Sequence, residues 1–582
     1  MSALAGGLLF ALGAGVSAVG YGSAIARLLR IRPALGDLGI LGLLGLASAG
    51  CIAHFLTPLS VPLQIVVLAI GLVLAAAFRR DILAGSLSIG LFAVAGLIAF
   101  VFVRPQAVDN YDYGLYYLQT FKWNREFPIV AGLGNLHSRL AYNSAIFLLA
   151  PLVDRSEWGW IANCLAVVFL LLALLARARQ SNSMTRWFVA FALIVFAIKP
   201  GWLNWLGLMQ SDALGAVLIL YWVALALSLA DAPHRPTAFA LLLLSAVLAV
   251  LTKVSMLPLL ALTAVLFWIH RRERPLGVAV GLFAAVALGA WMLRGIWLSG
   301  CAVYPIQQTC LSDLAWARPP AGLQEEQLAI RAWARAPDQW NFAGILSDWQ
   351  WFWPWATVAW RKRLVQLMTA GILLGLVARL TGARKVRHSH DDLTVLAAGL
   401  AVSMGFWFWS APDLRFGQGF IVAAGLLGWS FAASVWLTHA RWHSYGTYFL
   451  VLLMVLSGVR NLWQLDEQSF VATIPAVNVY QFKAGEDMRI WVPRIGDRCW
   501  EHELPCSPYL DRAALARVRW PVAWEYRYQP EFAPPAGWEP STMHSPPPTA
   551  SNAPGIPPHT EQAAEGARAA RDKAVHGIQS LE

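Results

Sequence analysis

Long stretches of apolar residues, separated by short polar or basic segments, make up most of the 582-residue chain. Many stretches contain about 20 residues, the length at which a helix crosses a lipid bilayer. They do not alternate apolar with polar positions, which excludes a membrane β-barrel. We therefore predict an all-α integral membrane protein, a polytopic helical bundle of about 14 spans. The predicted spans are residues 3–22, 37–57, 60–78, 83–103, 157–177, 185–199, 211–230, 236–251, 254–269, 275–298, 364–380, 393–410, 415–437 and 445–459.

Basic residues between the apolar stretches give the orientation. Five clusters fall on one side of the predicted bundle, which is cytoplasmic because Lys and Arg concentrate in cytoplasmic loops. These clusters are Arg27/Arg30/Arg32, Arg79/Arg80, Arg177/Arg179/Arg186, Arg271/Arg272/Arg274 and Arg384/Lys385/Arg387. The loops 104–156 and 299–360 and everything after residue 460 are then extracytoplasmic. One cluster, Arg361-Lys362-Arg363, falls on the outer side, which an interfacial helix before the span 364–380 would explain.

Seven regions follow from this pattern. They are N-terminal transmembrane helices (1–103), a first large extracytoplasmic loop with an acidic motif (104–156), a transmembrane core (157–298), a second extracytoplasmic loop (299–360), C-terminal transmembrane helices (361–459), a small extracytoplasmic module (460–535) and a tail (536–582). Pro and Ser are abundant at the start of the tail, so we predict that it is disordered.

Composition supports a membrane protein and argues against a nucleic-acid partner. The chain is 58% hydrophobic and 13% charged, with a mean hydropathy of +0.54. Soluble proteins carry about 25% charged residues. The net charge of +11 comes from short clusters between apolar stretches, where membrane topology places basic residues. We therefore expect no nucleic-acid binding.

The six cysteines divide into two groups. Cys51 and Cys164 lie within apolar stretches and are expected to be inert packing residues. Cys301/Cys310 and Cys499/Cys506 form close pairs in predicted outer loops, as disulfides do in an oxidising compartment. A four-thiolate zinc site is the alternative, but eight and six intervening residues do not match the usual metal spacing.

The first outer loop begins with the acidic and aromatic sequence Asp109-Asn-Tyr-Asp112-Tyr-Gly-Leu-Tyr-Tyr, directly after an apolar stretch. Asp109 and Asp112 would share one face of a helix. Paired carboxylates suit a general base, a metal ligand or an acceptor of sugar hydroxyl groups. A solvated loop whose acids cap a helix is the alternative. Further along the loop, His137 and Arg139 are candidates for substrate or phosphate binding, with His137 in a hydrogen-bonding role.

Other polar residues lie at the boundaries of predicted spans. Asp212 follows Ser211 at the start of a span, where both residues also suit a helix cap. Lys253 interrupts two apolar stretches, where a lysine either reaches the interface or binds a phosphate. Arg415 lies in a short link between two spans and suits a lipid phosphate, although a surface pair with Asp413 is the alternative. Arg335, a further candidate for substrate or phosphate binding, lies in the second outer loop among Trp residues that suit a sugar-binding lid or an interfacial belt.

Several of these motifs resemble those of a group of bacterial polytopic membrane proteins distantly related to the C-type glycosyltransferase (GT-C fold) superfamily. The resemblance covers residues 80–515 and rests on the acidic loop, Gly132-Leu-Gly-Asn-Leu-His137, Ser211-Asp212, Thr252-Lys253-Val-Ser255, Ser299-Gly-Cys-Ala-Val-Tyr304-Pro305, Trp333-Ala-Arg335-Ala-Pro337, Ala411-Pro-Asp-Leu-Arg415-Phe416, Cys499-Trp500 and Pro505-Cys506-Ser-Pro508-Tyr509. Enzymes of the superfamily use lipid-phosphate-linked sugars. The resemblance implies that Asp109 or Asp112 is the acid of the first loop and Asp212 the second acid.

The chain contains no Walker, Rossmann or zincin motif. We expect a glycosyltransferase of the bacterial cytoplasmic (inner) membrane that transfers a sugar from a polyprenyl-phosphate donor to a glycan or lipid acceptor on the extracytoplasmic face. Asp109, Asp112 and Asp212 would be catalytic, and Lys253 and Arg415 would hold the donor phosphate. The carboxylates leave a divalent cation, Mg²⁺ or Mn²⁺, open as a cofactor, although the chemistry does not require one. A cell-envelope glycan flippase or polymerase and a non-catalytic assembly protein are the alternatives.

Overall fold

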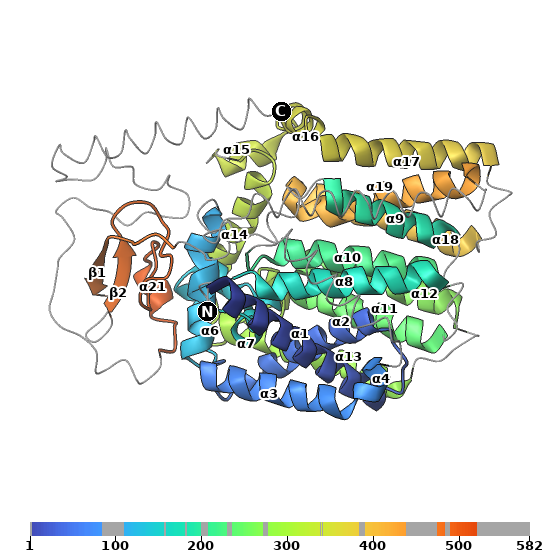
Figure 1. Ribbon diagram of the computed structural model, residues 1–582. Helices are drawn as coiled ribbons and strands as arrows, with labels where there is room; N and C mark the ends of the chain where they lie inside the picture. The colour runs from blue at the N-terminus through green and yellow to red at the C-terminus, as the bar shows by residue number, and fades with distance from the viewer. Residues whose placement is uncertain are drawn as a thin grey trace.

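The protein is described by a computed structural model, and its helices run in one bundle (Figure 1). The structure describes residues 3–83, 110–155, 159–180, 183–198, 208–229, 235–271, 277–337, 339, 341–382, 390–437, 474–483 and 489–520. Predicted features that fall elsewhere, including the tail 536–582, lie outside the described residues.

Twelve apolar helices form the bundle in the described part of the chain. They are α1 (Ala3–Leu28), α2 (Leu35–Ala53), α3 (Val61–Ala77), α8 (Ile161–Gln180), α9 (Ser183–Ile198), α10 (Ser211–Ser228), α11 (Arg235–Thr252), α12 (Leu257–Ile269), α13 (Val278–Ser299), α17 (Arg363–Gly382), α18 (His390–Ser410) and α19 (Leu414–Trp436). Eight are long and apolar enough to cross a membrane, and α3, α9, α11 and α12 are shorter. The protein is therefore a multi-pass membrane protein.

Each of these helices coincides with a predicted span. The predicted span 445–459 lies outside the described residues, and so does the span 83–103 apart from its first residue. The count of about 14 spans therefore stays a prediction, which rests on apolar stretches of about 20 residues.

Small residues let the helices pack closely. A side chain at Gly42 of α2 would overlap the backbone of Ala18 in α1, and one at Gly428 of α19 would overlap the backbone of Gly371 in α17. Close backbone approach at small residues is the usual way for helices to pack within a membrane. The outer faces of α13 and α17 remain apolar and exposed, as lipid-facing surfaces are, for example at Val278 and Leu380.

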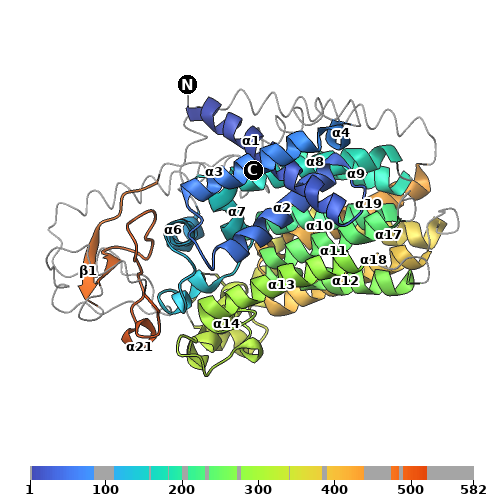
Figure 2. The ribbon, with the colours of Figure 1, turned by 90° about the horizontal axis from the view of Figure 1, so that it is seen from below.

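The two ends of the bundle differ in chemistry. The short helices α6 (Leu118–Glu126), α14 (Pro320–Trp333) and α15 (Phe342–Ser347) lie at one end, and α4 (Arg79–Leu83) lies at the other (Figures 1 and 2). Both disulfides lie at the first end, here named the disulfide end. At the opposite, basic end, the Arg27 guanidinium stacks 4.8 Å from the ring centroid of Phe78, and the Arg32 backbone N–H donates to Thr237 Oγ1 at 3.2 Å. The cluster Arg27/Arg30/Arg32 thus lies at the same end as Arg79 and Arg80 of α4, as predicted.

A buried ion pair joins three helices at the basic end. Arg177 of α8 lies 2.8 Å from Asp37 of α2, and the Tyr221 hydroxyl of α10 donates to the same carboxylate oxygen at 2.7 Å. Asp37 also accepts the Ala34 backbone N–H at 3.0 Å, which caps the start of α2. The pair needs these hydrogen bonds because a charge in the bilayer is expensive unless it is satisfied.

Both predicted disulfides, Cys301–Cys310 and Cys499–Cys506, are present, and Cys51 and Cys164 are free and buried. The disulfides indicate that this end is extracytoplasmic, because such bonds persist in oxidising compartments.

A small C-terminal module, residues 474–483 and 489–520, packs against the disulfide end. Its strands β1 (Val479–Lys483) and β2 (Arg489–Pro493) pair antiparallel with Gln481 opposite Trp491, and the short helix α21 (Arg512–Leu515) follows. The Trp500 backbone N–H donates to the Gly114 carbonyl at 2.8 Å, and the Arg519 N–H donates to the Ala131 carbonyl at 2.9 Å. The module is thus attached to the first outer loop.

The helix α16 (Phe352–Trp360) directly precedes the cluster Arg361-Lys362-Arg363. It exposes the rings of Trp353 and Trp360, and Arg361 and Lys362 are exposed as well. A helix therefore precedes the outer basic cluster, as predicted. That this helix lies in the membrane interface stays a prediction.

Candidate functional site

A cavity of about 1510 Å³ opens at the disulfide end of the bundle. Its walls come from the first outer loop, the start of α10, the break between α11 and α12, helix α14, the link between α18 and α19, and the C-terminal module. The lining therefore brings together segments from residue 110 to residue 509. All described segments that the sequence analysis selected for acidic or basic chemistry, apart from Arg335 and His137, contribute to it.

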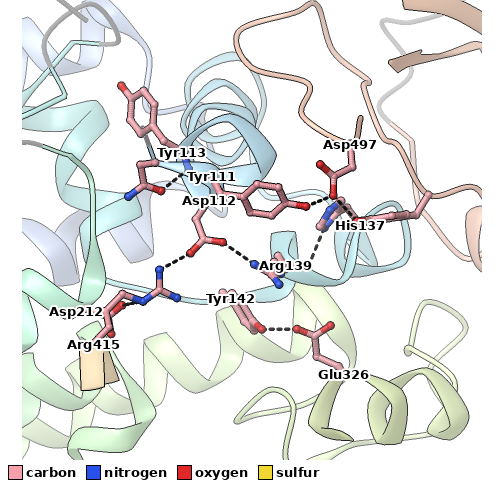
Figure 3. Close-up of polar contacts among 12 residues, drawn as sticks. Tyr111, Asp112, Tyr113, His137, Arg139, Tyr142, Asp212, Glu326, Arg415 and Asp497 are labelled. Atoms are coloured by element: carbon pink, nitrogen blue, oxygen red, sulfur yellow. Dashed lines mark hydrogen bonds and ion pairs between the residues drawn. The ribbon is translucent and has the colours of Figure 1, made fainter. Parts of the chain in front are cut away.

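Asp112 occupies the centre of the charged part of this cavity. It begins the π-helical turn η1 (Tyr113–Tyr117), a distortion that is frequent at functional sites. Its side chain is almost fully buried, with Oδ1 2.6 Å from Arg139 Nη1 and Oδ2 2.8 Å from Arg415 Nη1 (Figure 3). Burial alone would raise the pKa of Asp112, but the two guanidinium groups outweigh burial and lower it. The carboxylate is thus held as an anion.

Arg415 bridges two acids. The Asp413 side chain accepts the backbone N–H of Arg415 at 2.8 Å and so caps α19. The Arg415 guanidinium reaches into the cavity, where it meets the two acids. Its Nη1 binds Asp112, and its Nε lies 3.5 Å from Asp212 Oδ2. Asp413 also interacts electrostatically with Arg415, but Asp112 and Asp212 contribute more.

Asp212 and Lys253 form the other half of the charged cluster. Asp212 lies in the first turn of α10, but Gln210 precedes that turn as the cap residue, so Asp212 does not cap the helix. Its Oδ1 pairs closely with Lys253 Nζ. Lys253 is extended between α11 and the 3₁₀ turn Val254–Met256, where the helix breaks, and its Nζ lies 3.8 Å from the ring centroid of Phe416. The helix break thus turns a lysine toward the cavity.

The ion cluster consists of Arg139, Asp112, Arg415, Asp212 and Lys253 in that order of contact. Three cations hold two carboxylates, so the cluster carries one excess positive charge. The side chains are mostly buried, where charges interact more strongly than at an open surface. Such a cluster can bind an anion that competes with the carboxylates for the cations.

Two predicted site residues, Arg335 and His137, do not line the cavity, and a third cannot be placed. Asp109 lies outside the described residues. Arg335 does not line the cavity: its guanidinium donates to the carbonyl groups of Trp409 and Arg331 at 2.8 and 2.7 Å and stacks on Trp351. It thus ties the end of α14 to α18. His137 is buried beside the cavity, where its Nδ1 accepts the Arg139 backbone N–H at 3.1 Å. This contact caps the 3₁₀ turn Ser138–Ala141, which carries Arg139.

Aromatic side chains form one wall of the cavity. Trp333, Phe342, Phe406, Trp407 and Trp409 line it on the α14 and α18 side. Phe406 and Trp409 are 44% and 67% exposed although they lie near the end of an apolar helix. This wall can therefore accept an apolar chain or stack against a sugar ring.

Sequence analysis missed Glu326, Tyr142 and two cavity arginines. Glu326 is fully buried and accepts a close hydrogen bond from the Tyr142 hydroxyl (Figure 3). Glu326 lies three residues after Leu323, on the same buried face of α14. An acid on the apolar face of a helix was the feature of the sequence that could have indicated a buried site residue. Arg331 and Arg498 also line the cavity and form no ion pair with the described residues. Arg331 lies in the Trp-rich segment that suits a lid, but it was not selected as a site residue, and neither was Arg498.

The carboxylates of Asp112 and Asp212 do not fit a divalent cation. Both oxygens of Asp112 and both oxygens of Asp212 already face cationic groups. Among the residues that the structure describes, no group of three or more His, Cys, Asp or Glu side chains is placed to hold a metal. We therefore derive no step that uses Mg²⁺ or Mn²⁺.

Comparison with known proteins gives a family but no activity. No curated protein matches the chain, and no solved structure matches it. A link to the C-type glycosyltransferase superfamily is thus not established by these comparisons. One family, described as a domain of unknown function (DUF8201), matches residues 8–422. Because this match covers most of the chain, the protein belongs to the DUF8201 family.

Proposed function

We propose that the protein is a glycosyltransferase that takes its sugar from a polyprenyl-phosphate donor and transfers it on the extracytoplasmic face of the bacterial inner membrane. The observation that carries this proposal is the convergence of Asp112, Asp212, Lys253 and Arg415 on one large cavity at the disulfide end. Each buried charge has a desolvation cost, so five of them around one large cavity favour a binding or catalytic role over a scaffold.

The donor would use both parts of the cavity. Its phosphate would replace carboxylate contacts on Arg415 and Lys253, with Arg331 or Arg498 adding positive charge. Arginine and lysine are the usual phosphate partners in proteins. The polyprenyl chain would run past Phe406 and Trp409, the exposed aromatic residues of the cavity wall. As the bond from sugar to phosphate breaks, the cations would stabilise the charge that develops on the phosphate.

A binding experiment tests the donor site without knowledge of the sugar. Undecaprenyl phosphate is the carrier that such a reaction releases, and its binding to the purified protein in nanodiscs is the measurement. We expect Arg415→Lys to weaken binding several-fold and Lys253→Gln to weaken it about tenfold, the effect of losing one charge-assisted contact. Lys362→Gln is the matched control, because Lys362 is exposed near the same end and does not line the cavity.

Turnover is then tested with a panel of undecaprenyl-phosphate hexoses, with release of undecaprenyl phosphate as the readout. We expect Asp112→Asn to abolish release in a protein that still elutes as a folded monodisperse species. Equal binding by wild type, Lys253→Gln and Lys362→Gln would refute the donor site. A wild-type protein that moves undecaprenyl phosphate between leaflets but releases none from the hexoses would favour the flippase alternative.

A further inference from the structure

Glu326 differs from the other acids of the cavity in its surroundings. Asp112 and Asp212 have cations on both carboxylate oxygens. Glu326 Oε1 accepts a hydrogen bond from the Tyr142 hydroxyl, and Glu326 Oε2 has no hydrogen-bond partner among the described residues. The side chain is 0% exposed, and an unpartnered carboxylate oxygen in such a place is costly unless it has a task.

The neighbouring groups are three tyrosines and one arginine. Tyr142 packs edge to face against Tyr116 with ring centroids 5.8 Å apart, and its ring lies 5.8 Å from that of Tyr304. The Tyr304 hydroxyl is buried and also lacks a partner among the described residues. Arg139 is the cation that interacts electrostatically with Glu326, but its guanidinium binds Asp112. The cavity therefore has a second polar part, formed by Glu326, Tyr142 and Tyr304, next to the ion cluster.

A general base needs a carboxylate that is free to take a proton. The ion cluster lowers the proton affinity of Asp112, since Arg139 and Arg415 both favour its charged form. Asp112 is therefore suited to positioning cations and poorly suited to accepting a proton. No cation of the described residues pairs with either oxygen of Glu326. Tyr142 connects Glu326 to the cavity, because Tyr142 is only half-buried and lines it.

We propose that Glu326, acting through the hydroxyl of Tyr142, takes the proton of the acceptor hydroxyl group; this proposal rests on the transferase function above. In the step, the acceptor oxygen bonds to C1 of the sugar as the bond from C1 to the phosphate oxygen breaks. The acceptor proton passes to Tyr142 Oη, and the Tyr142 proton passes to Glu326 Oε1. The polyprenyl phosphate leaves with the electron pair and one more negative charge, and Glu326 becomes neutral, so charge balances.

The same assignment names the class of acceptor. Tyr304 and Gln327 line the cavity next to Glu326; Tyr304 offers its hydroxyl, and Gln327, whose amide N–H donates to the Pro305 carbonyl at 2.6 Å, offers its amide oxygen. These groups recognise a neutral polyhydroxyl compound, since hydroxyl and amide groups donate and accept hydrogen bonds in turn. The acceptor would therefore be a saccharide hydroxyl and not a phosphate or an amine.

Chemical labelling tests the assignment without turnover. Dicyclohexylcarbodiimide is apolar and adds to a carboxyl group in its protonated form, whose proton passes to a carbodiimide nitrogen. A carboxylate held by cations resists protonation and so resists the reagent, and mass spectrometry locates the adduct. We expect labelling of Glu326 in the wild-type protein and none at position 326 in Glu326→Gln. Glu325→Gln is the control, because Glu325 does not line the cavity, and it should leave the labelling of Glu326 unchanged. Labelling of Asp112 or Asp212 without Glu326, or no labelling at Glu326, would overturn the assignment.

Kinetics separate a base from a structural acid. Glu326→Gln keeps an oxygen that accepts the Tyr142 hydrogen bond but cannot take a proton. We expect the release rate to fall about 100-fold, the usual contribution of a general base, with the decline of the wild-type rate at low pH removed and the affinity for undecaprenyl phosphate unchanged. Tyr142→Phe should lower the rate to a similar degree.

The two proposals fail in different ways. A wild-type protein that does not bind undecaprenyl phosphate refutes the donor site, and then the transferase function falls. A wild-type protein that turns over, with an unchanged rate and pH profile in Glu326→Gln, refutes the proton acceptor alone. A variant that loses undecaprenyl phosphate affinity and rate together would show a structural acid and would also overturn the assignment.

Discussion

The Asp112 carboxylate and the Arg415 guanidinium, which are 303 residues apart in the chain, lie with Oδ2 and Nη1 at 2.8 Å. This contact joins the first outer loop to the link between α18 and α19. Because Arg415 also approaches Asp212, one side chain connects three separate segments. The contact therefore holds the charged part of the cavity together.

Loss of the Asp112 carboxylate should destabilise the protein. Asp112→Asn leaves Arg139 and Arg415 without their shared anion, and breaking a buried pair by removing one partner costs about 3 kcal/mol. We expect a lower midpoint of thermal unfolding for the purified protein. Asp313→Asn, at an exposed loop position, should leave the midpoint unchanged.

The double variant Asp112→Asn/Arg415→Gln checks that the effect belongs to the pair. Its loss of stability should be smaller than the sum of the two single losses by about 1–3 kcal/mol, because the second change removes an uncompensated charge. Additive losses would contradict a direct interaction between the two residues.

Stability at low pH should depend on His137. Burial, assisted by Arg139 and Arg318, lowers the pKa of His137 to about 3, whereas an unfolded histidine titrates near 6.5. Between these values the unfolded state binds the proton and the folded state does not, so stability is full above pH 6.5 and declines as the pH falls toward 3. The loss from this residue at pH 5 is about 2 kcal/mol.

His137→Asn removes the titration and keeps an acceptor for the Arg139 backbone N–H. Thermal unfolding between pH 8 and pH 5 is the measurement. We expect a smaller decline of the midpoint for the variant than for the wild type, and equal declines would show that His137 does not carry this dependence.

The docking of the C-terminal module should fail when Gly114 gains a side chain. A Cβ atom there would lie 2.7 Å from the Trp500 ring, and overpacking of a fixed contact costs about 1–3 kcal/mol. We expect Gly114→Ala to make residues 474–520 more sensitive to limited proteolysis. Gly281→Ala is the control, since a Cβ at Gly281 meets nothing within 4 Å, and it should leave the proteolysis pattern unchanged.

The ion pair at the basic end should matter for stability and not for the cavity. Tyr221→Phe removes the hydroxyl that donates to Asp37, and a hydrogen bond to a charged group is worth about 1.5–3 kcal/mol. We expect a lower unfolding midpoint with unchanged affinity for undecaprenyl phosphate. Reduced affinity without a change in stability would show that the two ends of the bundle are coupled.

The helices could be predicted from sequence because the membrane imposes a length and a continuous apolar character on them. The break at Lys253 and the link before Arg415 were visible for the same reason, since a polar residue interrupts the apolar stretch. The two disulfides followed from the closeness of their cysteines in outer loops. Each of these features is local in the chain.

The site was only partly predictable because its contacts join distant segments. Asp112 and Arg415 could each be selected from their surroundings, but no local pattern shows that one binds the other. Arg335 lies in the same Trp-rich segment as residues of the cavity wall. Its guanidinium binds backbone carbonyl groups because of where α14 ends, which the sequence does not show. Glu326 could be noticed only by its spacing from Leu323 on the buried face of a helix.

The position of Arg498 and Tyr509 in the cavity wall has a consequence for biosynthesis. A ribosome delivers Asp112 to the membrane long before it delivers these two residues, and multi-domain chains fold in the order of their synthesis. The cavity therefore stays incomplete until the C-terminal module has been made and has docked on Gly114. A nascent chain that stops before residue 498 would carry the whole ion cluster in a cavity without this wall, so the pocket is completed long after its charged residues have been made.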